Sequence, residues 1–149
     1  MEKFGEFISY SVIDTENWAK QVAKTLKSGT VVALFGDLGA GKTAFTRGLA
    51  AALECPEDVS SPTFSIVNNY GKTNLENHPS LIHFDMYRVN NIDDLEVSGY
   101  YDYIDAGDVL VIEWSENIVD ELPDDAFKIY IKHSFENDTE QRIIKWEKN

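Results

Sequence analysis

Two apolar patterns early in the chain predict a strand followed by a helix. Residues 30–35 (TVVALF) form a continuous apolar run rich in β-branched side chains, which is typical of a strand buried on both faces. Residues 42–53 follow, with Phe45, Leu49 and Leu53 on one face of the expected helix. Together these segments predict a strand–loop–helix unit whose strand lies inside a sheet.

The N-terminal segment predicts a short strand and an amphipathic helix. Residues 7–12 are expected to form the strand. Asp14 is expected to cap the helix, because its carboxylate can accept a hydrogen bond from a first-turn amide, and Gly29 is expected to end it. The apolar positions of this helix recur at helical spacing: Trp18, Val22 and Leu26.

The second half of the chain is predicted to be rich in strands. Five segments carry the apolar or alternating pattern of strands: residues 64–70, 81–86, 109–112, 127–133 and 141–146. The last two are expected to pair as a hairpin, and short helices are expected at residues 92–97 and 99–104. The predicted fold is α/β, a P-loop NTPase-like mixed sheet of about seven strands flanked by helices, in a single domain over residues 1–149.

The loop between the early strand and its helix carries the sequence GDLGAGKT at residues 36–43. This matches the Walker A pattern G-x-x-x-x-G-K-[ST] at every fixed position. The amide groups of such a loop surround a phosphate, so Lys42 is expected to reach the β- and γ-phosphates of a nucleotide and the Thr43 hydroxyl to bind Mg²⁺. The predicted nucleotide-binding residues are Asp37, Leu38, Gly39, Ala40, Gly41, Lys42, Thr43 and Ala44.

A dinucleotide-binding interpretation of the same loop fits less well. Residues 39–44 also match the relaxed fingerprint G-x-G-x-x-A. That fingerprint expects its first glycine directly after the strand, whereas three residues intervene here. It also expects an acid at the end of a second strand, but Asp58 lies in a loop containing proline and serine.

Two carboxylates end apolar strands and are candidates for the metal side of the site. Glu113 follows VLVI, and Asp85 follows LIHF. We predict that Glu113 and Thr43 hold the metal, and that Asp85 positions water or acts outside the first coordination sphere. His83 is expected to be a strand histidine whose hydrogen bonds are satisfied.

A hydroxyl-rich segment follows the predicted P-loop helix. It consists of Ser60, Ser61, Pro62 and Thr63. Such a segment can supply a phosphate or Mg²⁺ ligand in a nucleotide switch, and it can equally be an ordinary turn that enters a strand. The chain lacks the N-K-x-D pattern that reads guanine, which favours ATP.

Charge and cysteine content limit the classes of partner. The 149 residues carry a formal net charge of −13, and residues 91–125 contain twelve acids without Lys or Arg. This distribution argues against direct nucleic-acid binding, which needs basic residues, and leaves either a solvated acidic face or a docking face for a basic partner. The single Cys55 excludes an internal disulfide and suits a reducing compartment, and we expect a cytoplasmic protein without a signal peptide or membrane span.

Four motifs in this order resemble the bacterial TsaE (formerly YjeE) family of small P-loop ATPases. They are GDLGAGKT at residues 36–43, SPTF at 61–64, HFDMYR at 83–88 and IEW at 112–114. The family helps to make threonylcarbamoyladenosine in tRNA. The resemblance implies a weak intrinsic ATPase that supports turnover of the TsaD–TsaB heterodimer, with tRNA reached only through that complex.

The resemblance also assigns roles to individual residues. It implies that Lys42 and Thr43 hold phosphate and Mg²⁺ and that Glu113 is the Walker-B-like metal residue. It implies that Asp85 is needed for activity and that Trp114 is the aromatic residue beside the metal. The segment 60–63 matches the switch-like loop of the family.

Two other functions remain open from the P-loop alone. The chain could be a small-molecule kinase, although it has little sequence left for a substrate domain or an arginine-bearing lid. It could also be a nucleotide-sensing switch that needs no turnover. A kinase would consume ATP together with an acceptor molecule, and a sensor would need no ATP turnover. The ATPase of the leading hypothesis would hydrolyse ATP slowly without an acceptor.

Overall fold

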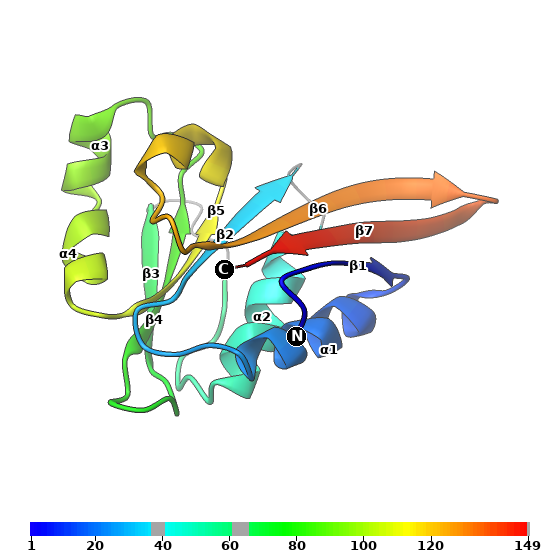
Figure 1. The fold of residues 1–149 in the computed structure, drawn as a ribbon, viewed down its shortest axis with the longest axis horizontal. Coiled ribbons are helices and arrows are strands. Elements are labelled where there is room, and N and C mark those ends of the chain that lie inside the picture. The colour runs from blue at the N-terminus through cyan, green and yellow to red at the C-terminus, as the bar shows by residue number, and fades with distance from the viewer. Residues whose placement is uncertain (37–40, 61–65, 149) are drawn as a thin grey trace.

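The computed structural model describes residues 1–36, 41–60 and 66–148, in which the chain folds around one mixed sheet (Figure 1). The strands are β1 (Phe4–Ser9), β2 (Val31–Gly36), β3 (Val67–Lys72), β4 (Ser80–Asp85), β5 (Val109–Glu113), β6 (Phe127–Glu136) and β7 (Thr139–Glu147). The helices are α1 (Val12–Ala23), α2 (Lys42–Ala52), α3 (Ile92–Val97), α4 (Tyr100–Asp105) and the 3₁₀ helix η1 (Ser115–Glu121). The predicted α/β fold with a mixed sheet of about seven strands flanked by helices is confirmed.

Parallel strands form the centre of the sheet, whose order is β1-β7-β6-β2-β5-β4-β3. β6, β2, β5 and β4 are parallel neighbours. β7 and β1 extend the sheet antiparallel on one side, and β3 pairs antiparallel with β4 on the other. Because parallel strands all point the same way, the carboxyl ends of the central strands lie at one edge of the sheet.

Alternate residues of the central strands pack into two apolar clusters, one on each face. Val32 and Leu34 of β2 and Val111 of β5 contact the cluster that includes α1 and α2. Val31 and Leu110 belong to the cluster under α3 and α4. Figure 1 shows these two helix pairs on different sides of the sheet. Burial on both faces explains why residues 30–35 are a continuous apolar run rather than an alternating one.

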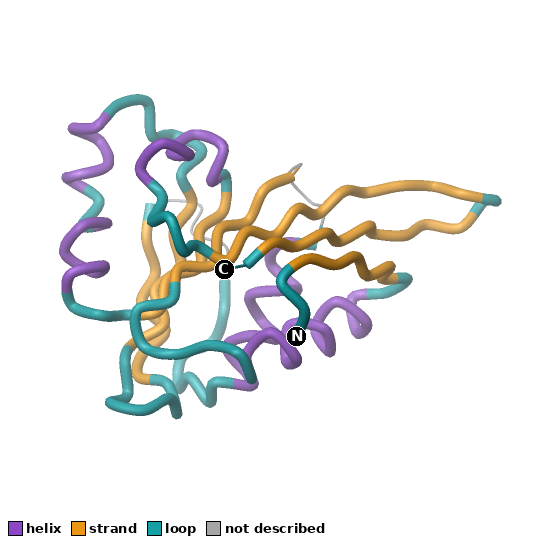
Figure 2. The backbone as a smooth tube through the Cα atoms, viewed as in Figure 1, coloured by secondary structure: helices purple, strands orange, loops and turns teal. Residues whose placement is uncertain are grey.

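The β6–β7 hairpin extends beyond the helices as an arm (Figure 2). Its pairing runs from Lys128↔Glu147 to Glu136↔Thr139. The predicted hairpin is confirmed, and both strands are longer than the predicted 127–133 and 141–146. The extra residues near the turn are mostly polar, so their alternating pattern is weak in the sequence.

The predicted ends of the first helix were wrong. Ser11, not Asp14, is the N-cap, and its hydroxyl accepts a hydrogen bond from Asp14 N at 3.0 Å. The Asp14 carboxylate instead accepts a hydrogen bond from Tyr10 N at 3.0 Å. The Ser11 and Asp14 side chains therefore bind two backbone amides at the start of the helix, as in a capping box. The helix ends at Ala23, well before Gly29, which lies in the turn that leads into β2.

Two strand boundaries and one helix also differ from the prediction. β1 covers Phe4–Ser9 rather than residues 7–12, because the chain turns after the buried Ser9, whose hydroxyl contacts Thr15 Oγ1 at 2.7 Å. β3 covers Val67–Lys72 rather than residues 64–70, of which 64 and 65 lie outside the described residues. The 3₁₀ helix η1 was not predicted.

The helices are short compared with a membrane-spanning segment. α1 has 12 residues and α2 has 11. Among the helices of the described ranges, none is long and apolar enough to cross a membrane.

Trp18 of α1 packs against the outer strands β1 and β7 and against the helix α2. Its ring lies 6.2 Å from that of Phe7 on β1, 5.7 Å from that of Phe45 on α2 and 5.5 Å from that of Trp146 on β7. Aromatic rings at these separations attract one another beyond their contribution to burial. Trp18 therefore fixes α1, and through it α2, against the sheet.

We predict that Trp18→Ala lowers the free energy of unfolding by about 3–5 kcal/mol, because it removes a large buried side chain and leaves a cavity between four elements. Urea denaturation followed by circular dichroism measures the change. Val97→Ala is the control, since Val97 is 88% exposed and its loss is expected to matter by less than about 0.5 kcal/mol. A loss below about 1 kcal/mol for Trp18→Ala would contradict the role given to this ring.

Candidate functional site

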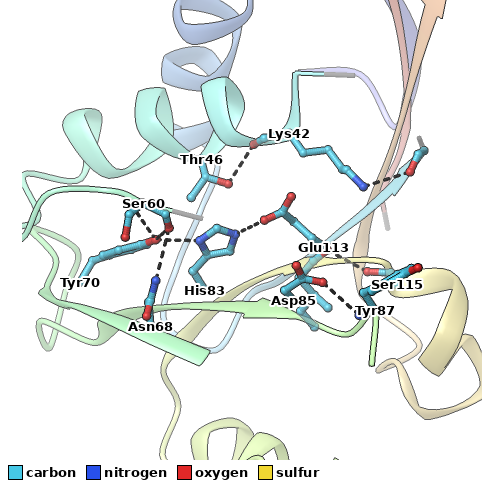
Figure 3. A network of polar contacts seen from close by, with 12 residues as sticks. Lys42, Thr46, Ser60, Asn68, Tyr70, His83, Asp85, Tyr87, Glu113 and Ser115 are labelled. Atoms are coloured by element: carbon cyan, nitrogen blue, oxygen red, sulfur yellow. Dashed lines mark hydrogen bonds and ion pairs between the residues drawn. The ribbon is translucent and has the colours of Figure 1, made fainter. Parts of the chain in front are cut away.

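Three central strands end beside the first turn of α2. β2 ends at Gly36, β4 at Asp85 and β5 at Glu113, while α2 begins at Lys42. The strand register sets Asp85 beside Glu113. Figure 3 shows Glu113 with one carboxylate oxygen turned to His83 and the other turned toward α2. The carboxyl ends of strands in open α/β sheets are where ligands usually bind, so this edge is the candidate site.

The N-terminus of α2 is suited to an anion. Its cap is Gly41, whose backbone is left-handed with φ of 103°. A glycine cap offers no side-chain acceptor to the first-turn amides, which leaves them for a ligand, and the helix dipole adds partial positive charge there. Thr43 and Ala44 lie in this first turn, as the Walker A pattern predicts.

Within the described ranges, a carbonyl oxygen and an aromatic ring hold the Lys42 ammonium inside the site. The residue is only 2% exposed. Its Nζ donates to the Gly36 carbonyl oxygen at 3.0 Å and lies 4.8 Å from the centre of the Trp114 ring. The Trp114 backbone is itself left-handed, with φ of 58°, and its ring also packs against Tyr87 at 4.9 Å. Lys42 is therefore kept beside the end of β2 by a carbonyl and an aromatic face.

A buried histidine binds the predicted metal-side carboxylate. Glu113 Oε2 lies 2.6 Å from His83 Nε2, and these residues are 3% and 0% exposed. The prediction that His83 is a strand histidine with satisfied hydrogen bonds is confirmed, but its partner Glu113 on the neighbouring strand was not foreseen. A buried carboxylate needs such a partner, because an unpaired buried charge is costly.

The other ring nitrogen of His83 leads to Tyr70 and then to Ser60. His83 Nδ1 lies 2.8 Å from the Tyr70 hydroxyl, which donates to the Ser60 carbonyl oxygen at 2.6 Å. Burial raises the pKa of the Tyr70 phenol above its ordinary value, so the hydroxyl keeps its proton at neutral pH. The first residue of the predicted hydroxyl-rich segment is thus tied to the site through β3 and β4.

Asp85 lies beside Glu113 but is bound differently. Its Oδ1 accepts a hydrogen bond from Tyr87 N at 3.0 Å, and the residue is half-buried. The turn after β4 therefore fixes the Asp85 carboxylate at the same edge while leaving it partly open to solvent. This position suits the predicted role of holding a water better than that of a buried ligand.

The described residues suit Mg²⁺ only together with other oxygen donors. The Thr43 hydroxyl and the Glu113 carboxylate are hard oxygen ligands of the kind that Mg²⁺ prefers. In the described part of the chain, no group of three or more His, Cys, Asp or Glu side chains is arranged to hold a metal ion. Phosphate and water oxygens would have to complete the coordination, as is usual for nucleotide-bound Mg²⁺.

Part of the predicted site lies outside the described residues. This applies to Asp37, Leu38, Gly39 and Ala40 of the nucleotide loop and to Ser61, Pro62 and Thr63 of the hydroxyl-rich segment. The predicted residues that the structure does bring to this edge of the sheet are Lys42, Thr43, Asp85, Glu113 and Trp114.

Two side chains near the site were missed by sequence reasoning. Glu116 of η1 accepts a hydrogen bond from Gly36 N at 3.1 Å and so fixes the end of β2. Arg142 of β7 lines a pocket of about 240 Å³ together with Tyr10, Ser11 and Gly41. Both belong to elements far from the motif in sequence, and no short pattern marks either of them.

Comparison with known proteins points to one family. The family model described as threonylcarbamoyl adenosine biosynthesis protein TsaE matches residues 9–144. A protein of Treponema pallidum named tRNA threonylcarbamoyladenosine biosynthesis protein TsaE is 36% identical over 125 residues, which is 84% of this chain and 89% of that protein. Proteins of the same name from Bacillus subtilis and Aquifex aeolicus are 38% and 42% identical, over 85% and 78% of this chain and 77% and 80% of theirs.

A solved structure shares the fold. The crystal structure of Bacillus subtilis YdiB superposes with a TM-score of 0.74 at 30% sequence identity, covering 99% of this chain and 87% of that chain. The likeness therefore covers almost the whole of this chain.

We predict that Gly36→Ala destabilises the protein by about 2 kcal/mol or more. Gly36 has a left-handed φ of 135°, and an alanine Cβ there would overlap the carbonyl oxygen of Ile131 on the neighbouring strand. Gly29→Ala is the control, because φ is 84° there but the space is open, so only the backbone cost of about 1–2 kcal/mol applies. Equal losses in urea denaturation would show that the close approach of β6 to Gly36 has no energetic consequence.

Proposed function

Because the chain belongs to the TsaE family of tRNA threonylcarbamoyladenosine biosynthesis proteins, we propose that it binds ATP with Mg²⁺ and hydrolyses it. Hydrolysis is slow for the chain alone and faster with the TsaD–TsaB heterodimer, whose turnover it supports. The protein meets tRNA only through that complex. The proposed compartment is the cytoplasm, which suits a chain with one free thiol, Cys55.

The observation that carries this proposal is the meeting of one ammonium and two carboxylates at the N-terminus of α2. Lys42 lies in the first turn of α2, and Asp85 and Glu113 end neighbouring parallel strands. Positive charge on the phosphate side and acidic groups on the metal side are the two halves that nucleotide hydrolysis needs. The ammonium comes from the helix α2 and the carboxylates from two strand ends, so a chance match of the loop motif is a poor explanation.

The chain's own residues supply phosphate binding. Among the described residues, Lys42 donates to the Gly36 carbonyl oxygen, and its ammonium also lies over the Trp114 ring, a contact that does not use a second donor. Its ammonium has further donors for the β- and γ-phosphates, and the first-turn amides of α2 supply neutral donors beside it. Lys42 therefore opposes the charge that develops on the phosphate oxygens in the transition state.

The two carboxylates have different proposed roles, one in metal binding and one in orienting water. Thr43 and Glu113 would hold Mg²⁺, which when bound neutralises charge on the phosphate oxygens. Asp85 orients the attacking water by accepting its hydrogen bond. Water attacks the γ-phosphorus, the bond from that phosphorus to the bridging oxygen of ADP breaks, and phosphate, ADP and a proton are released.

The pocket beside Gly41 is the proposed place for the rest of the nucleotide. It adjoins the start of α2 and is lined by Tyr10, Ser11 and Arg142. An aromatic ring and a guanidinium both suit stacking on a nucleobase or contact with its sugar and phosphates. The pocket lies between residues of α1, α2 and β7, so its shape depends on how these three elements pack.

ATPase measurement with and without the purified TsaD–TsaB pair tests the proposal. We expect slow release of phosphate by the chain alone and a clear increase with the pair. Consumption of ATP only with a small-molecule acceptor would instead identify a kinase. Tight nucleotide binding without turnover under any condition would identify a sensor.

We predict that Lys42→Ala weakens ATP binding by at least about 30-fold, since losing one partner of a buried charge pair typically costs about 2–5 kcal/mol. Isothermal titration calorimetry with MgATP measures the affinity. Lys20→Ala, at an exposed position of α1, is the control and should bind as the wild type does. Near-wild-type affinity of Lys42→Ala would exclude the proposed phosphate contact.

The acidic helix pair α3–α4 is the proposed docking surface for a basic partner. Asp93, Glu96 and Asp102 are exposed there, whereas Asp94 is half-buried and accepts a hydrogen bond from Asn90 N at 3.1 Å. Asp94 therefore stabilises the start of α3, and the first three residues are better targets for a charge test. In Figure 1 these helices lie at the end of the molecule opposite the hairpin arm.

We predict that Asp93→Asn, Glu96→Gln and Asp102→Asn together slow association with TsaD–TsaB and affect dissociation less. The reason is that long-range attraction steers encounter and is screened as the Debye length falls from about 10 Å at 0.1 M salt to about 3 Å at 1 M. Surface-based kinetics across a salt series measures both rates. The control removes the same charge from Glu2, Glu136 and Asp138, and equal slowing by both sets would mean that only net charge matters.

A further inference from the structure

A line of short polar contacts runs across three neighbouring strands, from the candidate site to the main chain of Ser60 (Figure 3). Glu113 of β5 contacts His83 of β4 at 2.6 Å, and His83 contacts the Tyr70 hydroxyl of β3 at 2.8 Å. The Tyr70 hydroxyl contacts both backbone polar groups of Ser60, since its oxygen lies 2.6 Å from Ser60 O and 3.3 Å from Ser60 N. We call these four residues the Glu113–Ser60 chain.

The direction of these hydrogen bonds follows from the donors available. Ser60 O is a carbonyl oxygen and only accepts, so the single Tyr70 proton is donated to it. The Tyr70 oxygen then accepts from His83 Nδ1–H and, more weakly, from Ser60 N–H. With Nδ1 committed as a donor toward Tyr70, the 2.6 Å contact between Nε2 and Glu113 Oε2 requires a proton on one of these two atoms, because two lone pairs would repel at that distance. The ring cannot turn over without breaking both contacts.

Burial makes this arrangement rigid. His83 is 0% exposed, Tyr70 2% and Glu113 3%, so water cannot readily replace a lost contact. Asn68 adds a second donor to Ser60 O at 3.3 Å. His83 and Glu113 project from paired positions of β4 and β5, which leaves little freedom for the Glu113 carboxylate to rotate away from His83, while Tyr70 projects from the irregularity of β3 between Asn69 and Lys72.

We propose that His83 and Tyr70 are positioning residues that orient the Glu113 carboxylate toward the start of α2 and couple it to the Ser60 main chain. This inference rests on the proposed ATPase function for its kinetic consequence, but its structural content does not depend on turnover. The position of Glu113 and the position of Ser60 are expected to respond to each other, because both are bound to the same two buried side chains.

Substitutions can break the chain at different points. Tyr70→Phe removes one hydroxyl, so Ser60 O keeps only the longer contact with Asn68 among the donors described above, and His83 Nδ1 loses its acceptor. His83→Asn keeps an amide near the Nδ1 position and loses the contact with Glu113. His83→Gln places an amide near the Nε2 position and can keep that contact. The three variants therefore separate the Glu113 end from the Ser60 end.

Steady-state ATPase kinetics with the TsaD–TsaB pair measures the effect on turnover. We expect His83→Asn to lower kcat by about ten-fold or more with little change in KM, since loss of a group that orients a ligand typically costs about 10- to 100-fold. His83→Gln should retain more of kcat than His83→Asn, and Tyr70→Phe should lower kcat by about three-fold. Equal loss in His83→Gln and His83→Asn would overturn the orienting role.

Tyr100→Phe is the matched control for Tyr70→Phe. Tyr100 is also fully buried, and its hydroxyl donates to Glu121 O at 2.8 Å on the other face of the sheet. Both variants lose one buried hydroxyl and should lose similar thermal stability. Only Tyr70→Phe should lower kcat, and an equal kcat loss in Tyr100→Phe would show that the effect is one of general stability.

Nuclear magnetic resonance of the nucleotide-free chain tests the coupling without any reaction. Glu113→Gln should shift the Ser60 amide resonance, and this response should disappear when Tyr70→Phe is added. An unchanged Ser60 resonance in Glu113→Gln, or the same shift with and without the Tyr70 hydroxyl, would overturn the inference. If the wild type fails to hydrolyse ATP while the Ser60 response is present, the proposed function fails and the coupling stands.

Discussion

Parallel pairing of β2, β5 and β4 brings three strand ends to the start of α2, and the candidate site depends on that pairing. Asp85 and Glu113 are 28 residues apart in the sequence but are register partners in the sheet. Gly36 ends β2 beside them, and the absence of a side chain at its φ of 135° accommodates the close approach of the Ile131 carbonyl oxygen of β6. Shifting β5 by one residue would turn Glu113 to the opposite face and remove it from α2.

Burial of charge at this edge requires partners that the local sequence does not provide. Lys42 is bound by a carbonyl of β2 and the ring of Trp114, and Glu113 is bound by His83. A buried ammonium or carboxylate without such contacts would destabilise the fold or lose its charge. The same contacts hold the two side chains in place before a ligand arrives, which reduces the reorganisation needed for binding and catalysis.

The helices on the two faces of the sheet differ in what they contribute. On one face, Trp18 and its aromatic neighbours fix α1 and α2, so the helix whose first turn forms the site rests on a tightly packed core. On the other face, α3 and α4 cover the sheet with exposed acids outside and Tyr100 and Leu95 inside. A surface for a partner can therefore vary in charge there without disturbing the packing beneath α2.

The sequence by itself determined the elements whose signals are local. The apolar run at residues 30–35, the Walker A loop and the acids that end VLVI and LIHF predicted the sheet class and the site residues Lys42, Thr43, Asp85 and Glu113. The contact of Glu116 with Gly36 N and the Glu113–Ser60 chain were decided only by the tertiary structure. The reason is that in both cases the hydrogen-bond donor and acceptor come from different elements, and a pattern along the chain does not contain which of them meet.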